Sequence, residues 1–393
     1  MSSQEQSLDS YRSDQNVALA DFGIHLLRTN PNATIDSMVI SPISISIALA
    51  MCYVGAKNNT SNQLAKVLGG GKVPKNPTIE HFSFLMKSLT EDHAERQYKL
   101  YSANKVYIKE GYNLLKNYKE ALVQKFGGQF ENVDFNDKQN TANKINNFVD
   151  KSTQGKITNL VNPASLSSDI SMLLVNALYF KGRWQNEFQK ELTQEKDFDV
   201  AENRKQKVNM MKATGTYPYY EDQKVQVLGL PYLNYEGVLY IILPKERFGL
   251  KKVLDEFSDG SLSKYIDKSM LNHDWITEVD VEIPRFKVET SLSLAETLKK
   301  LGITDAFTSG KADFSGISGN RELFIGEVLH KTYISMDEQG TEAAAATAVE
   351  LLAGAGFSED IRHVNFHADH PFLYAIVSKE GDTLFTGTVV DFK

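Results

Sequence analysis

Residues 337–352 read DEQGTEAAAATAVELL, and this stretch can be interpreted as either of two structures that exclude each other. As a helix it has Thr341 as its cap, alanines along its length and Gly354 as its end. As a strand it alternates cleanly, with Thr341 on one face and Glu342 on the other. Because alanine is a good helix residue and a poor strand residue, propensity favours the helix. The surrounding sequence has to decide between the two.

The sequence on both sides of this stretch mixes helical and strand patterns. Apolar residues at helical spacing predict helices, and apolar runs bounded by turn residues predict strands. The predicted helices cover residues 17–28, 43–56, 116–126, 140–151 and 292–301. The predicted strands cover residues 101–108, 172–180, 225–230, 238–243, 276–283, 323–325, 332–336, 372–377 and 383–390, the last two joined as a hairpin. We therefore predict an α+β fold.

One predicted helix, residues 43–56, is apolar on nearly every side. It follows Ser41 and Pro42, which supply a capping hydroxyl and a proline at the first helical position. A helix without a polar face is normally enclosed by other elements, so this one predicts a large core. No internal repeat or proline-rich linker divides the chain. We therefore expect residues 1–393 to form a single domain, with a polar extension at residues 1–16.

The composition argues against several classes of function. Hydrophobic residues make up 41% of the 393 residues, which is enough for a large core. The net charge is −7 and the basic residues are scattered, so we expect no nucleic-acid partner. No uncharged apolar run approaches the roughly 20 residues that span a bilayer, so we expect no membrane partner. The single cysteine, Cys52, lies in an apolar segment and is interpreted as a core residue.

Common signatures of catalysis are missing from the sequence. It contains neither the Gly-x-Ser-x-Gly of hydrolases nor the His-Glu-x-x-His of zinc proteases. Residues 69–72, GGGK, lack the spacing of a phosphate-binding loop and are interpreted as a plain loop. His363, His367 and His370 lie near Asp369, but no thiolate or helical spacing supports a metal site there. We therefore expect no enzyme activity, no cofactor and no metal.

Several separated motifs match one protein family in the same order along the chain. They are VISPIS at residues 39–44, NALYFKGRW at 176–184, LGITDAF at 301–307, ADFSG at 312–316, His330-Lys331, and FHADHPF at 366–372. From about residue 17 to residue 393 the sequence resembles the serpins, which are serine protease inhibitors. It resembles in particular the inhibitory, intracellular-type members that lack a signal peptide.

The resemblance implies three β-sheets, about nine helices and an exposed reactive-centre loop, with hinge and loop together at residues 338–362. In serpins a protease attacks this loop as a substrate and forms an acyl ester with it. The cut loop then enters the central sheet as a new strand and carries the enzyme along. The alanines at residues 343–346 suit this passage, because each side chain has to move between two packed strands. We therefore expect a metastable suicide inhibitor.

The resemblance also implies roles for single residues. Gly340 permits a change of direction, and Thr341 is the first side chain that insertion has to bury, where a charge would stop it. The hinge comprises Glu338, Gly340, Thr341, Glu342, Ala343, Ala344, Ala345 and Ala346. The shutter, a polar cluster beneath the central sheet where strands part, comprises Ser41, Ser44, Asn176 and His330. The breach, where the loop enters the sheet, comprises Trp184, Arg285 and Glu338, the last two interpreted as a surface ion pair.

Two counts place the scissile bond at different positions. With Glu338 as the first residue, the seventeenth is Gly354, which is the usual residue before the cut. Counting back eight residues from Phe366 gives Ser358 instead. We prefer the count from the hinge, because the length that inserts determines how far the protease is carried. The candidate bait residues are Leu351, Leu352, Ala353, Gly354, Ala355, Gly356, Phe357 and Ser358.

The bait sequence indicates the class of the partner protease. Residues 352–355 suit an elastase-like pocket that takes small apolar groups, whereas Phe357 suits a chymotrypsin-like pocket. We expect a covalent complex with a serine protease, and a monomer that can alternatively form loop-sheet polymers. The alternative functions are a non-inhibitory serpin with a binding, storage or chaperone role, and an inhibitor of cysteine proteases. Residues 1–16 carry no apolar signal, so we expect a cytoplasmic protein, or a secreted one if a signal peptide has been removed.

Overall fold

The computed structural model describes residues 3–90, 98–271, 277–341 and 362–393. These residues form ten α-helices and three β-sheets, which confirms the predicted α+β class. The helices are α1 (Ser3–Thr29), α2 (Pro42–Gly55), α3 (Asn58–Gly69), α4 (Lys75–Thr90), α5 (Lys116–Phe126), α6 (Lys138–Ser152), α7 (Leu250–Glu256), α8 (Ser261–Leu271), α9 (Ala295–Lys300) and α10 (Ser315–Ser318).

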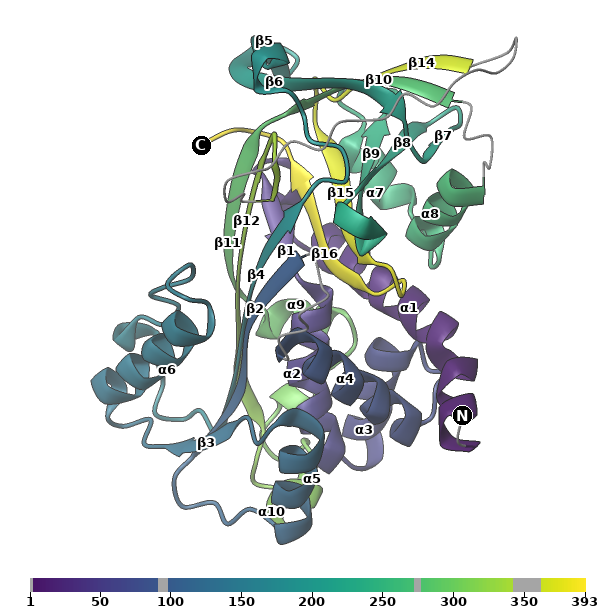
Figure 1. Cartoon of the computed structure of the whole chain (residues 1–393). Coiled ribbons are helices and arrows are strands. Elements are labelled where there is room, and N and C mark those ends of the chain that lie inside the picture. Colours follow the sequence, from purple (N-terminus) through teal and green to yellow (C-terminus); the bar gives the residue numbers. More distant parts are fainter. Residues whose placement is uncertain (1–2, 91–97, 272–276, 342–361) are drawn as a thin grey trace.

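One six-stranded sheet, which we call the central sheet, runs through the length of the molecule (Figure 1). Its strands, in order across the sheet, are β11 (Phe286–Ser293), β12 (Ile325–Asp337), β13 (Gly340–Thr341), β4 (Met172–Arg183), β2 (Tyr98–Lys109) and β3 (Phe130–Val133). Over most of their length β12 and β4 pair directly with each other as parallel strands. This pairing runs from Ile325 opposite Met172 to Tyr333 opposite Tyr179, and we call it the seam.

Helices lie against both faces of the central sheet (Figure 1). On β4, Leu173 and Val175 pack with residues of α6 in one hydrophobic cluster. Leu174 and Leu178, which point the other way, belong to the larger cluster that includes α2. Successive side chains of a strand point to opposite faces, so a strand covered on both sides is apolar throughout. This explains why residues 172–180 read as a continuous apolar run.

Two further sheets complete the fold. The buried sheet has the strand order β1 (Met38–Ile40), β16 (Thr383–Val389), β15 (Phe372–Ser378), β9 (Gly237–Pro244), β8 (Val225–Pro231) and β7 (Tyr219–Glu221). The small sheet has the order β14 (Arg362–His367), β10 (Thr277–Pro284), β6 (Arg204–Thr216) and β5 (Gln194–Ala201). Residues 342–361 therefore join the central sheet at Thr341 to an edge strand of the small sheet at Arg362.

The predicted elements agree with the structure where the apolar pattern is strong. Helix α5 has the predicted bounds, and α2 differs by one residue at each end. The two short strands predicted around residues 323–336 are in fact one strand, β12, because the polar residues between them are paired inside the fold. The predicted polar extension is also helical from Ser3 onwards, as part of α1. The sequence pattern did not predict β11 or the hairpin of β5 and β6.

Cys52 lies in the middle of α2 and is fully buried. Burial raises the pKa of its thiol to about 12, so the sulfur stays protonated and unreactive at neutral pH. The interpretation of Cys52 as a core residue is confirmed. Within the described parts of the chain, no helix combines the length and apolar character needed to cross a bilayer.

Candidate functional site

Beyond one end of the seam, β13 occupies the space between β12 and β4, and it consists of the hinge residues Gly340 and Thr341. Strand β13 lies between β12 and β4 and pairs antiparallel with both. Thr341 lies opposite Met336 on β12 and opposite Gly182 on β4. The expectation that the exposed loop starts directly after Glu338 is therefore wrong for Gly340 and Thr341, which are buried strand residues.

Gly340 makes this reversal of the chain sterically feasible. Its φ is +145°, a region of backbone conformation that residues with a side chain rarely adopt. A Cβ atom at this position would also collide with the carbonyl oxygen of Gly182. Both observations explain why a glycine stands where the chain turns back between the two strands.

Thr341 is buried with its side chain against Tyr232, which follows directly after β8 of the buried sheet. Its exposed fraction is 0%, and its Oγ1 lies 2.9 Å from the hydroxyl oxygen of Tyr232. The Tyr232 ring stacks on the indole of Trp184, with 4.8 Å between ring centroids and 15° between planes. This stacking holds the phenol in place, so the threonine hydroxyl has a fixed hydrogen-bond partner. The pocket around Thr341 is thus shaped for a small side chain with one hydroxyl.

Glu338 is held in the turn between β12 and β13. Its carboxylate accepts a hydrogen bond from the Thr193 hydroxyl at 2.7 Å and forms an ion pair with Arg285. Burial by itself would raise the pKa of Glu338, but the hydrogen bonds from Arg285 and Thr193 outweigh it, so the pKa is lowered. The Glu338 side chain is only 2% exposed, against 41% for Arg285. The interpretation as a surface ion pair is therefore wrong, because one partner is buried.

Trp184 donates two hydrogen bonds to the same turn, one at each end of it. Its indole Nε1 donates to the Asp337 carbonyl oxygen at 2.9 Å, and its backbone N–H donates to the Gln339 carbonyl oxygen at 3.0 Å. The Glu338 carbonyl oxygen accepts from the Phe188 backbone N–H at 2.8 Å. All three carbonyl groups of the turn are thus satisfied from one neighbouring segment, which stabilises the turn in this position.

A second polar cluster lies further along the seam, on the face toward α2. His330 on β12 and Asn176 on β4 lie opposite each other, and His330 Nδ1 donates to Asn176 Oδ1. The Ser41 backbone N–H donates to His330 Nε2 at 3.1 Å, so this nitrogen carries no proton and the ring is neutral. Burial lowers the pKa of His330 to about 3. The seam is therefore bridged by a neutral hydrogen bond inside the core.

Ser44 belongs to a neighbouring network rather than to the His330 bridge itself. Its hydroxyl donates to Asn104 Oδ1 on β2 at 2.9 Å, and its backbone N–H donates to the Ser41 hydroxyl at 3.3 Å. Asn104 lies opposite Asn176 in the strand pairing. The sequence-based interpretation missed Asn104, although a lone amide in an apolar strand could have signalled it. It also missed Tyr232 and Thr193, which only the tertiary structure brings to the hinge.

Comparison with known proteins agrees with this arrangement. A family model described as "Serpin (serine protease inhibitor)" matches residues 17–392. The chain belongs to the serpin family. It is thus a protein of the protease-inhibitor class and not an enzyme.

Relatives of this serpin match nearly their full length. Human leukocyte elastase inhibitor is 38% identical over 377 residues, covering 93% of this chain and 95% of the relative. Serpin B6 of Pongo abelii is 36% identical over 371 residues, covering 93% of this chain and 96% of the relative. The thermophilic serpin tengpin in its native state superposes with a TM-score of 0.83 at 31% identity, covering 96% of this chain and 94% of tengpin. Serpin48 of Tenebrio molitor gives 0.80 at 28%, with full coverage of both chains.

The structure brings most of the described site residues of this serpin together in two places. Trp184, Arg285, Glu338, Gly340 and Thr341 meet at the end of the seam, and Ser41, Asn176 and His330 meet further along it. The remaining hinge residues, Glu342 and Ala343 to Ala346, lie outside the described residues, as do all the bait residues from Leu351 to Ser358.

The buried His330 makes a specific prediction for the pH dependence of stability. A histidine in an unfolded chain titrates near pH 6.5, whereas the pKa of folded His330 is about 3. Between these values the unfolded state binds more protons than the folded state. His330 therefore leaves the free energy of unfolding unchanged above pH 6.5 and lowers it as the pH falls toward 3. At pH 5.5 the loss from His330 is about 1.4 kcal/mol relative to pH 7.5. The measurement is the free energy of unfolding in urea at both pH values. The difference between the two pH values should be smaller by this amount in His330→Gln than in the wild type.

Other groups titrate in the same range and are unchanged in that variant. Burial lowers the pKa of His81 to about 3 and raises that of Asp382 to about 6, with opposite effects on stability. Asn365→Gln is the control, because Asn365 is exposed on β14 and carries no titratable group. The control should keep the wild-type difference between the two pH values. An unchanged difference in His330→Gln would contradict the assignment.

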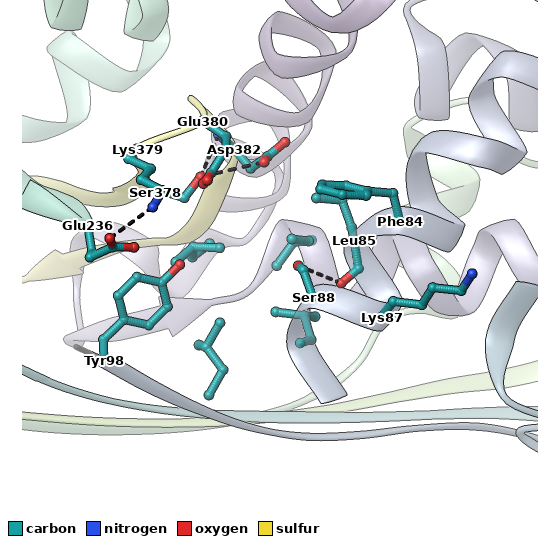
Figure 2. Close-up of a pocket in the computed structure, with 14 residues that line it drawn as sticks. Phe84, Leu85, Lys87, Ser88, Tyr98, Glu236, Ser378, Lys379, Glu380 and Asp382 are labelled. Carbon is teal, nitrogen blue, oxygen red and sulfur yellow. Dashed lines mark hydrogen bonds and ion pairs between the residues drawn. The ribbon is translucent and has the colours of Figure 1, made fainter. Parts of the chain in front are cut away.

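A separate hollow of about 420 Å³ lies between α4, β2 and the turn that joins β15 to β16 (Figure 2). Phe84 and Leu85 of α4 form one side, while Glu236 and Lys379 form the opposite side. The Asp382 carboxylate on this turn lies 3.5 Å from the Arg12 guanidinium. None of the described residues assigned to the hinge, shutter or breach lines this hollow, so it is not part of the seam site.

Proposed function

We propose that this serpin inhibits a serine-type endopeptidase by acting as a suicide substrate. The observation that supports the proposal most strongly is the position of β13. Gly340 and Thr341 already occupy the space between β12 and β4, with antiparallel pairing to both strands. A chain that continues from Thr341 in the same direction would extend this pairing, provided that the seam opens. The arrangement is that expected of a sheet ready to receive another strand.

The chemistry of the proposed reaction belongs to the protease until the loop is cut. The protease serine attacks the carbonyl carbon of the scissile bond, an acyl ester forms, and the C-terminal part of the loop leaves as an amine. In an ordinary substrate, water then hydrolyses the ester. In this proposal the N-terminal part of the loop moves into the seam before water attacks. The ester-bound protease is carried along with it and its active site is distorted.

The described residues have separate roles in the proposed insertion. Glu338 and Trp184 of the breach anchor the turn from which the strand inserts. Thr341 is the first buried residue of the inserting strand, and its side chain lies beside the Tyr232 hydroxyl. Asn176 and His330, the shutter, lie on the two strands that have to separate, so insertion breaks their hydrogen bond. Their separation is part of the free-energy barrier that keeps the uncut form intact.

The proposed partner is an elastase-like or chymotrypsin-like serine protease, held as a covalent complex with one monomer of this serpin. Residues 352–355 are small or apolar, as an elastase-like pocket requires. A relative of 38% identity carries the name leukocyte elastase inhibitor, which supports the same class. Phe357 is the residue that favours a chymotrypsin-like partner.

A direct test mixes the protein with elastase, chymotrypsin, trypsin and a cathepsin and separates the products on a denaturing gel. We expect a band with the combined mass of the serpin and elastase or chymotrypsin, less the released C-terminal peptide, because the ester survives denaturation. Mass spectrometry of the released peptide identifies the scissile bond, and we expect a peptide that begins at Ala355. A protease with a blocked active-site serine is the control and should give no band.

The other outcomes separate the alternative functions. A covalent band with the cathepsin alone would assign the protein to inhibitors of cysteine proteases. Cleavage by every protease without any covalent band would contradict inhibition and favour a non-inhibitory serpin.

A further inference from the structure

Three tyrosine rings form a continuous stack across the central sheet, which we call the tyrosine row. Tyr101 on β2, Tyr179 on β4 and Tyr333 on β12 lie opposite one another in the strand pairing. The centroids of Tyr101 and Tyr179 are 5.6 Å apart with 20° between planes, and those of Tyr179 and Tyr333 are 5.7 Å apart with 24°. These are the geometries of stacked aromatic pairs that attract each other beyond their contact area.

The two contacts of the row differ in one respect. Tyr101 and Tyr179 stand on β2 and β4, which pair with each other away from the seam. Tyr179 and Tyr333 stand on β4 and β12, so their contact crosses the seam. A strand inserted there moves the two rings apart by about one strand spacing, to roughly 10 Å between centroids, at which stacking is lost. The first contact survives insertion, and the second does not.

The row lies on the α6 face of the sheet, opposite to the face of the His330–Asn176 bridge. Tyr179 belongs to the hydrophobic cluster of α6, and Tyr101 and Tyr333 pack against that cluster. The Lys156 ammonium, just beyond α6, lies 5.7 Å from the Tyr179 ring centroid. The neighbouring chain is also tied to β12, because Lys331 Nζ donates to the Thr158 carbonyl oxygen at 2.9 Å. The seam is therefore closed by side chains on both of its faces.

We propose that the Tyr179–Tyr333 contact sets the rate at which a strand enters the seam, and that Tyr333 is a positioning residue for the inhibitory reaction. This inference rests on the proposed function. Holding the seam closed slows conversion of the uncut protein, but it also delays the cut strand while water competes for the ester. The contact thus adjusts the balance between a long-lived native form and efficient trapping.

The pairing of β13 indicates what replaces the lost contact. Thr341 lies opposite Gly182 on one side and Met336 on the other. Continued antiparallel for three residues, both registers bring position 344 opposite Tyr179 and Tyr333 alike. The sequence has Ala344 there, outside the described residues. After insertion the two rings would lie on either side of a methyl group. Each ring would move with its own strand, and neither side chain would have to change its rotamer.

The test measures uptake of a synthetic peptide of residues 342–352 by the uncut protein, so that it requires no protease. Tyr333→Leu should take up the peptide about fivefold faster than wild type, which corresponds to about 1 kcal/mol of barrier. Tyr333→Phe keeps a stacked ring and should retain the wild-type rate. Tyr333→Val, which suits a strand equally well, replaces Tyr333→Leu if the latter does not fold.

Tyr101→Leu is the matched control, because it removes a stacked partner of the same Tyr179 ring away from the seam. It should lower thermal stability without accelerating peptide uptake. Uptake at the wild-type rate in Tyr333→Leu, or equal acceleration in Tyr101→Leu, would overturn the inference and leave the proposed function intact. If no variant and not even the wild type takes up the peptide, strand insertion itself is contradicted. The experiment therefore separates the failure of the two proposals.

Discussion

Thr341→Arg should convert this serpin from an inhibitor into an ordinary substrate of its partner protease. The Thr341 side chain is fully buried between β12 and β4 and contacts the Tyr232 hydroxyl. Because this position is already buried in the uncut form, an arginine there would displace β13 from between β12 and β4. Insertion would then have to bury a charge beside the Tyr232 hydroxyl, which is not a carboxylate. Such a charge costs about 3–5 kcal/mol, which slows insertion about 10²- to 10⁴-fold. Water then hydrolyses the ester before the strand has entered.

The measurement for Thr341→Arg compares the covalent band on a denaturing gel with the amount of cut serpin. We expect rapid cleavage and almost no covalent complex. Thr341→Ser keeps the hydroxyl and a similar volume and should behave as wild type. Gln339→Arg adds the same charge on the turn, two residues away and outside the strand pairing, and should still form the complex. A normal yield of complex in Thr341→Arg would mean that inhibition does not depend on insertion at this position.

The architecture was predictable from the sequence wherever one physical signal dominated. The helix of residues 43–56 lacks a polar face, and the structure encloses it as α2 between other elements. The pattern failed where polar residues are satisfied inside the fold. His330 divides the apolar pattern of residues 323–336, yet its bonds to Asn176 and Ser41 let it stand in the middle of β12. Only the folded structure supplies these partners, so local sequence could not reveal them.

The ambiguous stretch at residues 337–352 shows the same limit for the site. Its alanines favour a helix by propensity, but Gly340 and Thr341 are a strand. The deciding contacts come from Gly182 and Met336 on two other strands, and from Tyr232. The resemblance to serpins led to Glu338 and Arg285, whereas nothing in the local pattern indicated Thr193 or Tyr232. Residues that complete a site from a distance are found by their contacts.

Cutting the loop should make the protein much more stable to heat, although cutting a peptide bond usually destabilises a fold. Continuation of β13 along the seam would add roughly ten backbone hydrogen bonds at about 1 kcal/mol each. This total is comparable to the 5–15 kcal/mol that stabilises a typical domain. We expect the thermal midpoint to rise by about 10 to 20 °C, since each kcal/mol shifts the midpoint of a large domain by about 1 to 2 °C.

The experiment for the cut protein nicks the loop with a protease, removes the protease and records thermal melts of the cut and uncut forms. Thr341→Arg, cut in the same way, is the control that separates cleavage from insertion. It should melt close to the uncut protein, because its strand is hindered at the first buried position. A cut wild-type protein that melts within about 2 °C of the uncut form would contradict insertion, since even one or two added hydrogen bonds shift the midpoint that far. A large rise in the wild type alone would identify insertion of the cut strand between β12 and β4 as the source of the released free energy.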